Sequence, residues 1–217
     1  MARPLSSKWC GTGQKGATPV VVETAISPRL AEEKWPPQGQ WTYEDYKRLP
    51  DDGWRYEVIE GELHMAPAPR PKHQEATINL ATAMSQFARS KKLGKVYTAP
   101  IDVLLHGLAS PVQPDVLFIA SDRLDIVKEE FIEGPPDLTI EVLSPSNWLD
   151  DRRTKFRLYA RAGVREYWIV DLERRTIEVF ALHGHSFTLL NRYEPGETVR
   201  SEVLPDFEIA VEAVCLP

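Results

Sequence analysis

The sequence predicts an α/β (α+β) fold in which a mixed sheet is flanked by helices and extended by extra β-hairpins. Apolar residues recur at helical spacing in two segments, residues 73–91 and 151–162. Around these segments, short apolar runs are separated by turn residues, as expected of strands. The resulting order, α-β-β-α-β-β-β-α-β-β, favours a sheet with helices on its faces.

Residues 1–40 differ in composition from the rest of the 217-residue chain. They are rich in Gly, Pro, Ser and Thr, so we expect a poorly ordered extension before one folded domain over residues 41–217. Gly11, Gly13 and Gly16 match G-x-G-x-x-G, but no strand precedes them. A flexible tail is therefore favoured over a phosphate-binding loop.

The domain is expected to begin with a short helix. Thr42 is the expected N-cap, Asp45 completes a weakened capping box, and the helix ends before Pro50. Residues 56–60 and 62–65 then predict two strands joined around a glycine.

A long helix is predicted over residues 73–91. Lys91, Lys92 and Gly94 follow its apolar stripe, and cations with a glycine are typical of a helix C-terminus. The apolar residues at helical spacing are Ala76, Leu80, Ala83, Met84, Phe87 and Ala88.

The second half of the chain is mainly β. One helix interrupts it over residues 151–162, capped by Asp150 or Asp151. Residues 172–176 are typical of a hairpin turn, and residues 204–211 of a final extended segment. The predicted strands are 96–105, 114–120, 137–143, 166–172, 176–182 and 186–193.

Charge and cysteine content limit the function classes. A net charge of −6 gives no general attraction to nucleic acid, although a local basic groove is enough for phosphate contacts. Cys10 and Cys215 have no zinc-site spacing and make no disulfide framework, which favours a reducing cytoplasm. No apolar run reaches the roughly 18 residues of a membrane span. We therefore expect a cytoplasmic protein without a membrane segment.

Asp115 opens a strongly apolar strand, Val116–Ala120. A charge inside such a strand is costly unless it is paired or bound to a metal. Taken alone, the segment favours a simpler interpretation in which Asp115 ends the strand at the surface.

Glu141 stands in the middle of another apolar strand, between Ile140 and Val142. Strand alternation gives it the same face as Thr139 and Leu143. A metal ion or a buried salt bridge would each explain a carboxylate there, and the residues do not decide between them.

Lys155 lies on the second helix, on one stripe with Arg152 and Tyr159. Alone, a basic helix favours a solvated face. Together with two carboxylates from adjacent strands, Lys155 suggests a catalytic site. Asp115 and Glu141 can hold Mg²⁺, and a nearby lysine can stabilise charge on a phosphate. Metal-assisted phosphodiester hydrolysis needs these parts.

Four motifs resemble the Uma2 family of restriction endonucleases, within the PD-(D/E)XK nuclease superfamily. They are Tyr56-Glu-Val-Ile-Glu-Gly-Glu-Leu63, Pro114-Asp-Val116, Ile140-Glu-Val-Leu-Ser-Pro-Ser146, and Lys155-x-x-x-Tyr159-x-x-x-Gly163-Val-x-Glu-Tyr-Trp-Ile-Val-Asp171. The resemblance covers about residues 41–212. It implies a restriction-endonuclease-like nuclease domain that cuts DNA with Mg²⁺, or with Mn²⁺ as a substitute.

The resemblance also assigns roles. Asp115 corresponds to the aspartate of the Pro-Asp motif and Glu141 to the acid of the (D/E)XK motif. Val142 would offer its backbone carbonyl to the metal. The motif lysine is missing, since position 143 is Leu143, and Lys155 looks like its migrated replacement.

An acid from the N-terminal part often joins such a site. Glu57 and Glu60 are the candidates, with Glu57 preferred, and an ordinary surface strand residue is the alternative for each. His73 is expected to be a simple helix-start residue rather than a base at the site edge. Gln113 is expected only to shape the approach to the Pro-Asp motif.

Other polar and aromatic residues receive lesser roles. Ser144 and Ser146 flank a proline without a histidine signature for a nucleophile. Tyr167 and Trp168 are expected to pack the sheet, and Asp171 to cap a turn. Phosphate contacts are expected from Arg152, Arg153 and Arg157.

Three hypotheses remain. The chain is a metal-dependent DNA endonuclease, a catalytically inactive nuclease fold that binds nucleic acid or protein, or a protein in which the acids form a dry salt bridge with Lys155 without a cleft. We also expect a homodimer, with aromatic residues near Trp168 and Phe180 burying a sheet edge.

Overall fold

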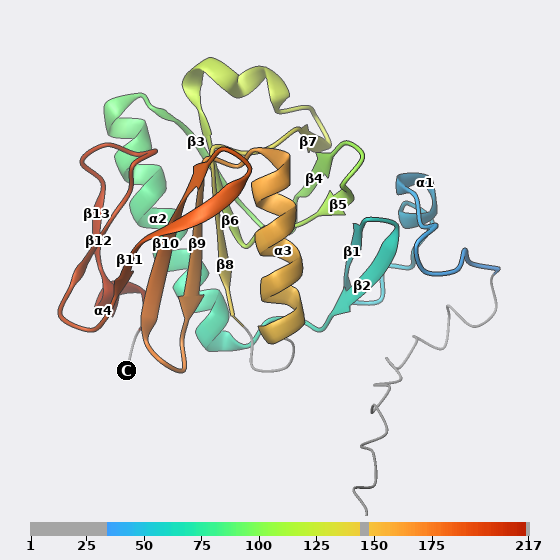
Figure 1. Ribbon diagram of the computed structural model, residues 1–217, viewed down its shortest axis with the longest axis horizontal. Coiled ribbons are helices and arrows are strands. Elements are labelled where there is room, and N and C mark those ends of the chain that lie inside the picture. Colours follow the sequence, from blue (N-terminus) through green and yellow to red (C-terminus); the bar gives the residue numbers. More distant parts are fainter. Residues whose placement is uncertain (1–33, 144–147, 216–217) are drawn as a thin grey trace, which may run out of the picture. The chain divides into compact units, whose positions relative to one another are not determined.

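The computed structural model describes residues 34–143 and 148–215, with the side chains of residues 148–152 excepted (Figure 1). The predictions for some residues therefore lie outside the described part. These residues are Cys10, Gly11, Gly13, Gly16, Ser144 and Ser146, with the side chains of Asp150, Asp151 and Arg152.

A six-stranded mixed sheet forms the centre of the described fold. All neighbours are antiparallel except β8 and β9, and helix α3 (Trp148–Ala162) makes the crossover that a parallel pair requires. In spatial order the strands are β11 (Ser186–Tyr193), β10 (Thr176–His183), β9 (Glu166–Asp171), β8 (Leu138–Val142), β6 (Val116–Ala120) and β3 (Gly94–Thr98).

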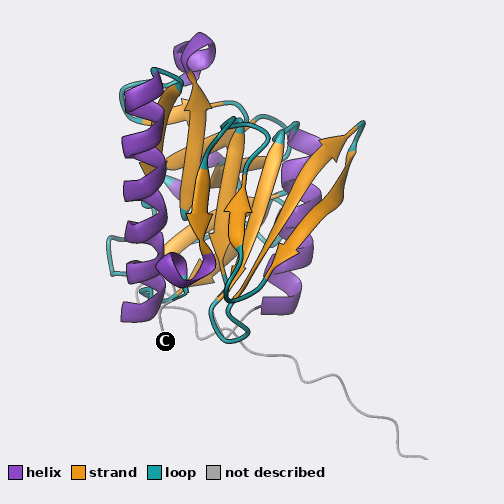
Figure 2. Ribbon diagram, turned by 90° about the vertical axis from the view of Figure 1, so that its left-hand side faces the viewer, coloured by secondary structure: helices purple, strands orange, loops and turns teal. Residues whose placement is uncertain are grey.

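Helices α2 (Pro71–Lys91) and α3 cover opposite faces of this sheet (Figure 2). In β8, Leu138, Ile140 and Val142 join the core that contains α2. Because successive side chains of a strand alternate between faces, Thr139 and Glu141 point to the α3 side. Strand geometry therefore directs the carboxylate of Glu141 at a helix.

A second, five-stranded sheet contributes to the core on the α3 side. Its residues Ile59, Val103 and Val112 share that core with Leu158 of α3. In spatial order its strands are β2 (Glu62–Ala66), β1 (Arg55–Ile59), β5 (Ala109–Val112), β4 (Asp102–Leu105) and β7 (Phe131–Glu133).

Short elements complete the fold. Residues from the strand pair β12–β13 and from α4 join the same core as α2. These elements are α1 (Tyr43–Tyr46), the 3₁₀ helix η2 (Ser121–Ile126), β12 (Thr198–Arg200), β13 (Glu208–Ala210) and α4 (Val211–Val214).

The predicted fold class, a mixed sheet flanked by helices with extra hairpins, is confirmed. The capping box is also present, because the Thr42 side chain accepts a hydrogen bond from the Asp45 backbone N–H while the Asp45 carboxylate accepts one from that of Thr42. Asp171 caps its turn by accepting from the N–H groups of Glu173 and Arg174.

The prediction of one strand over residues 96–105 is wrong. The segment divides into β3 and β4, which belong to different sheets. Pro100 lies between them and has no N–H to offer a ladder, so the chain leaves the first sheet there.

The end of α2 also differs from the prediction. Lys92 takes the left-handed C-cap position with φ 57°, whereas Gly94 begins β3. A Cβ atom on Gly94 would lie 2.0 Å from the carbonyl oxygen of Ile119. Glycine is therefore needed here for the close approach of β3 to β6.

The C-terminal segment 204–211 is only partly extended, since β13 is followed by α4. Trp168 and Phe180 themselves are 0% and 8% exposed within this chain, and the expectation that aromatic residues near them bury a sheet edge between two copies stays a prediction. The homodimer itself stays a prediction. No helix in the described residues combines the length and apolar character needed to cross a bilayer.

Candidate active site

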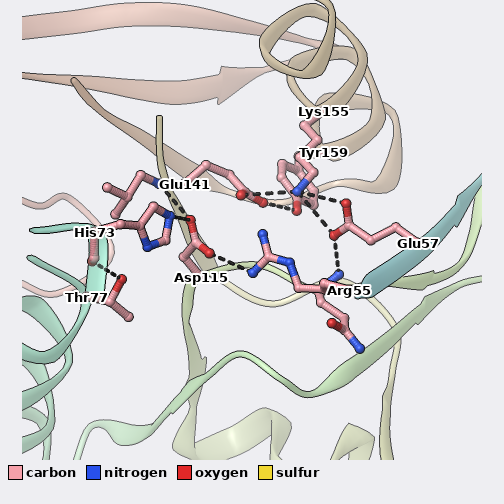
Figure 3. A network of polar contacts seen from close by, with 10 residues as sticks. Arg55, Glu57, His73, Thr77, Asp115, Glu141, Lys155 and Tyr159 are labelled. Atoms are coloured by element: carbon pink, nitrogen blue, oxygen red, sulfur yellow. Dashed lines mark hydrogen bonds and ion pairs between the residues drawn. The ribbon is translucent and has the colours of Figure 1, made fainter. Parts of the chain in front are cut away.

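Polar side chains from β1, α2, β8, α3 and the residue before β6 meet where the two sheets face α3 (Figure 3). The members are Arg55, Glu57, His73, Asp115, Glu141, Lys155 and Tyr159. We call this set the carboxylate cluster.

Asp115 and Glu141 face each other across two neighbouring strands. The antiparallel register of β6 and β8 pairs Val116 with Ile140. One step further along this register, Asp115 lies opposite Glu141. Both residues are buried, at 2% and 6% exposure. The two acids that the sequence singled out therefore belong to one site.

Asp115 accepts hydrogen bonds on both of its carboxylate oxygens. Arg55 Nη1 lies 2.9 Å from Oδ1, while His73 Nε2 and the Val142 backbone nitrogen lie 3.2 and 2.9 Å from Oδ2. Burial alone would raise the pKa of Asp115, but the His73 hydrogen bond and the charge of Arg55 lower it below its ordinary value. Asp115 is thus held as a carboxylate.

Arg55 interacts electrostatically with the three carboxylates of the cluster, those of Asp115, Glu57 and Glu141. Burial by itself lowers the pKa of its guanidinium, but Asp115, Glu57 and Glu141 raise it above its ordinary value. Arg55 therefore stays charged beside Asp115.

Lys155 connects the two remaining acids. Its Nζ atom lies 3.2 Å from Glu141 Oε2 and 3.1 Å from Glu57 Oε1, and the residue is 2% exposed. One helical turn further on, the Tyr159 hydroxyl donates to Glu141 Oε1 at 2.6 Å. Burial, together with the charges of Glu141 and Glu57, raises the pKa of Tyr159 well above its ordinary value.

Of the two candidate N-terminal acids, the structure brings Glu57 into the cluster. Glu57 Oε1 also accepts the backbone N–H of Gln113 at 2.7 Å. Glu60 is exposed and pairs with Arg161 outside the cluster. Gln113 also donates its side-chain amide to Asp102, 2.8 Å away, so it connects the cluster to β4.

Three members of the cluster differ from the expectations. The prediction that His73 merely begins a helix is wrong, because it contacts Asp115. Arg55 was missed, although alternation gives it the face of Glu57 two residues later. Tyr159 was given no role at the site, and its spacing of four from Lys155 was the available signal.

A cleft of about 900 Å³ opens onto the Asp115 side of the cluster. Asp115, Arg55 and His73 line it, whereas Glu57, Glu141 and Lys155 are not among its lining residues. The cluster thus has an accessible end at Asp115 and a buried end at Lys155. The ion pairs of Lys155 with Glu57 and Glu141 thus lie off the cleft, whereas Asp115 lines it, and the salt-bridge hypothesis stays a prediction.

Comparison with known proteins agrees with this architecture. A family model described as "Uma2: Putative restriction endonuclease" matches residues 43–212. The chain belongs to the Uma2 family. A crystal structure of a "putative nuclease belonging to DUF820" from Anabaena variabilis superposes with a TM-score of 0.67 at 17% identity, covering 80% of this chain and 97% of that one. At this identity, the likeness shows a shared fold. No curated protein matches the sequence.

The donor set of this Uma2 chain fits a hard divalent cation. Asp115 and Glu141 offer carboxylate oxygens, and Mg²⁺ often uses only one or two carboxylates while keeping several waters. The cluster also holds a third carboxylate, Glu57, and two cations, Arg55 and Lys155. Among the described residues, no three His, Cys, Asp or Glu side chains are already arranged as a metal site.

Leu143 stands where the resemblance expects the motif lysine. It is partly buried against the core on the α3 side, the side to which Glu141 points. Lys155 approaches Glu141 from the helix on this same side. The amine therefore reaches the motif acid from a different element.

Proposed function

We propose that this Uma2 chain is a divalent-metal-dependent endonuclease that hydrolyses phosphodiester bonds of DNA. The observation that carries the proposal is the 3.2 Å contact between Lys155 Nζ and Glu141 Oε2, beside the opposed pair of Asp115 and Glu141. The motif acids and a lysine, separated in the sequence, thus form one cluster at the edge of a cleft.

In this proposal Asp115 and Glu141 hold Mg²⁺, or Mn²⁺ in its place, with the backbone carbonyl of Val142 as a further ligand. A divalent cation bound there would polarise the scissile phosphate and make a water molecule more acidic. Because Arg55 and His73 already contact the Asp115 oxygens, a bound metal would have to share these oxygens with them or lengthen the two contacts.

The chain's own residues supply the remaining functions. Lys155 stabilises negative charge that develops on the phosphate, and Glu57 keeps its ammonium group near Glu141. Arg55 and His73 orient the Asp115 carboxylate, which is already ionised. The exposed Arg153 and Arg157 of α3 offer contacts to backbone phosphates, which add affinity without sequence information.

A plasmid-nicking assay tests the proposal. Wild-type protein should nick supercoiled DNA with Mg²⁺ or Mn²⁺ and not with EDTA. Asp115→Asn and Glu141→Gln should abolish nicking. Glu60→Gln should not, and it is a matched change because Glu60 is an exposed glutamate that directly follows β1. Metal-independent nicking, or full activity of Glu141→Gln, contradicts the proposal.

The alternative is a catalytically inactive nuclease fold that binds nucleic acid or protein. The observation that favours it is the occupation of both Asp115 oxygens by donors from Arg55, His73 and Val142. It predicts no metal affinity at this site. Calorimetric binding of Mg²⁺ or Mn²⁺ that is lost in Asp115→Ala would exclude it.

A further inference from the structure

Trp54 lines the same cleft as Asp115 and is 40% exposed. Most large apolar side chains of the described residues are buried, and Trp54 immediately precedes Arg55, which contacts Asp115. No other aromatic ring stacks on Trp54 within the described part of the chain. Its indole ring is thus an exposed flat surface beside the candidate active site.

The size of the cleft limits what can enter it. A volume of about 900 Å³ lies within the roughly 300–1,000 Å³ of cavities that enclose one small ligand. A base can stack on an aromatic side chain only where its own face is free, as in an unpaired strand. One or two unpaired nucleotides are of suitable size.

The walls match the two parts of a nucleotide strand. Trp54 supplies exposed aromatic surface, on which bases stack whatever their sequence, whereas Tyr56 is only 5% exposed. Lys47 and Arg55 also line the cleft, but they pair with Glu44 and Asp115 and Asp51 adds a negative charge, so the unpaired cations lie beside the cleft at the start of α2. This combination of aromatic platform and cations is typical of sites for single-stranded nucleic acid.

Further positive charge lies where α2 begins. The exposed Arg70 and Lys72 flank Pro71 in the chain, next to the cleft-lining residues Pro69 and His73. The first turn of α2 contains no acidic residue. Among the described residues no ion pair neutralises Arg70 or Lys72, so both are available to strand phosphates.

We propose that the cleft binds an unpaired nucleotide of a single-stranded DNA segment, with its base stacked on Trp54, strand phosphates on Arg70 and Lys72, and one phosphate beside Asp115, where the proposed function has the metal. This inference rests on the proposed nuclease function for the role of Asp115. It adds a substrate class, because it makes single-stranded segments, rather than intact duplex, the DNA that this protein engages.

Fluorescence anisotropy in EDTA measures binding without cleavage. The probes are a labelled 12-nucleotide single strand and the blunt duplex of the same sequence. Wild-type protein should prefer the single strand. Trp54→Ala should weaken single-strand binding by about tenfold or more, since stacking on one aromatic side chain is worth roughly 1–3 kcal/mol per base. Trp54→Phe, which keeps a ring, should retain most of the affinity.

Leu189→Ala is the matched control, because Leu189 is a large apolar side chain that is 47% exposed but lies outside the cleft. It should bind as wild type does. Equal affinity for single strand and duplex, no binding of either probe, or an unchanged affinity of Trp54→Ala overturns the inference. Single-strand binding that depends on Trp54, with neither cleavage of the single strand nor nicking of the plasmid in Mg²⁺, would leave the inference standing and reject the nuclease proposal.

Discussion

The Nε2 atom of His73 lies 3.2 Å from Oδ2 of Asp115, on the lining of the cleft. The same oxygen accepts the backbone N–H of Val142 at 2.9 Å. Two donors from different elements, the first turn of α2 and strand β8, therefore fix the orientation of one carboxylate oxygen. His73 is in this way a positioning residue for Asp115.

Replacing His73 with alanine should lower nicking activity. Loss of a residue that orients a metal-binding carboxylate costs about 10- to 100-fold in metal affinity or activity. We expect His73→Ala to need a higher Mg²⁺ concentration for half-maximal nicking. A Mg²⁺ titration of the initial nicking rate measures this, and His73→Gln, which keeps a side-chain N–H donor, should recover part of the loss.

His106→Ala is the comparison for this change, because His106 is exposed and pairs with Glu133 away from the cleft. It should leave the Mg²⁺ titration unchanged. An unaltered Mg²⁺ requirement in His73→Ala would show that the histidine does not act through Asp115.

Lys155→Met should destabilise the fold strongly. The change removes the buried ammonium group that contacts Glu57 and Glu141, and breaking a buried ion pair by removing one partner costs about 3–5 kcal/mol. Arg55 still faces these acids, but it already donates to Asp115. The free energy of unfolding, from urea denaturation, measures the effect.

The comparison is Lys95→Met in β3, where the lysine is exposed and the expected change is within about 0.5 kcal/mol. If Lys155→Met were equally mild, the buried ion pairs would not be part of the folded state in solution.

Asp115 should make stability fall on acidification. Its pKa is lowered in the folded state, so its contribution is full above the unfolded value of about 3.9 and is lost as the pH falls through the folded value. Asp115→Asn should therefore show a shallower loss of unfolding free energy below about pH 4. Urea denaturation at a series of pH values measures both slopes, and parallel curves would contradict the assignment.

The same experiment can follow Glu166, whose pKa is shifted in the opposite direction to that of Asp115. Burial raises its pKa despite hydrogen bonds from the N–H groups of Val203 and Glu202 and from Trp168. Its contribution is present below the unfolded value and is lost as the pH rises through the raised folded value. Glu166→Gln should flatten this loss on the alkaline side while leaving the acid limb to Asp115.

The core of the site was predictable because charges in apolar strands need partners. Asp115 opens such a strand and Glu141 interrupts another, while positions 155 and 159 lie on one helical stripe. The long helices and the hairpins β9 to β11 were predictable for a similar reason, since their periodic patterns run over many residues.

The remaining parts depend on tertiary contacts. Arg55 is 60 positions from Asp115, and only the pairing of β1 with β5 brings it near. The strands β5, β7 and β12 have three or four residues, too few to show alternation, and β5 contains Pro111. Local pattern gives no signal for such contacts.

Restoring a lysine at position 143 tests whether Lys155 replaces the motif lysine. Leu143 is partly buried and lies two residues after Glu141, on the side that Lys155 approaches. The double variant Leu143→Lys with Lys155→Met should nick DNA about tenfold or more faster than Lys155→Met alone, because removal of a single electrostatic donor costs about 10²–10³-fold and partial recovery is expected.

The matched control is Leu143→Met with Lys155→Met, which keeps an apolar side chain of similar volume at position 143. Because this control shares the loss of stability caused by Lys155→Met, a faster rate in the lysine variant alone must come from the amine. Equal rates in the two double variants would mean that the amine acts only from α3. The function of Lys155 would then depend on its place on α3, from which it contacts Glu57 as well as Glu141.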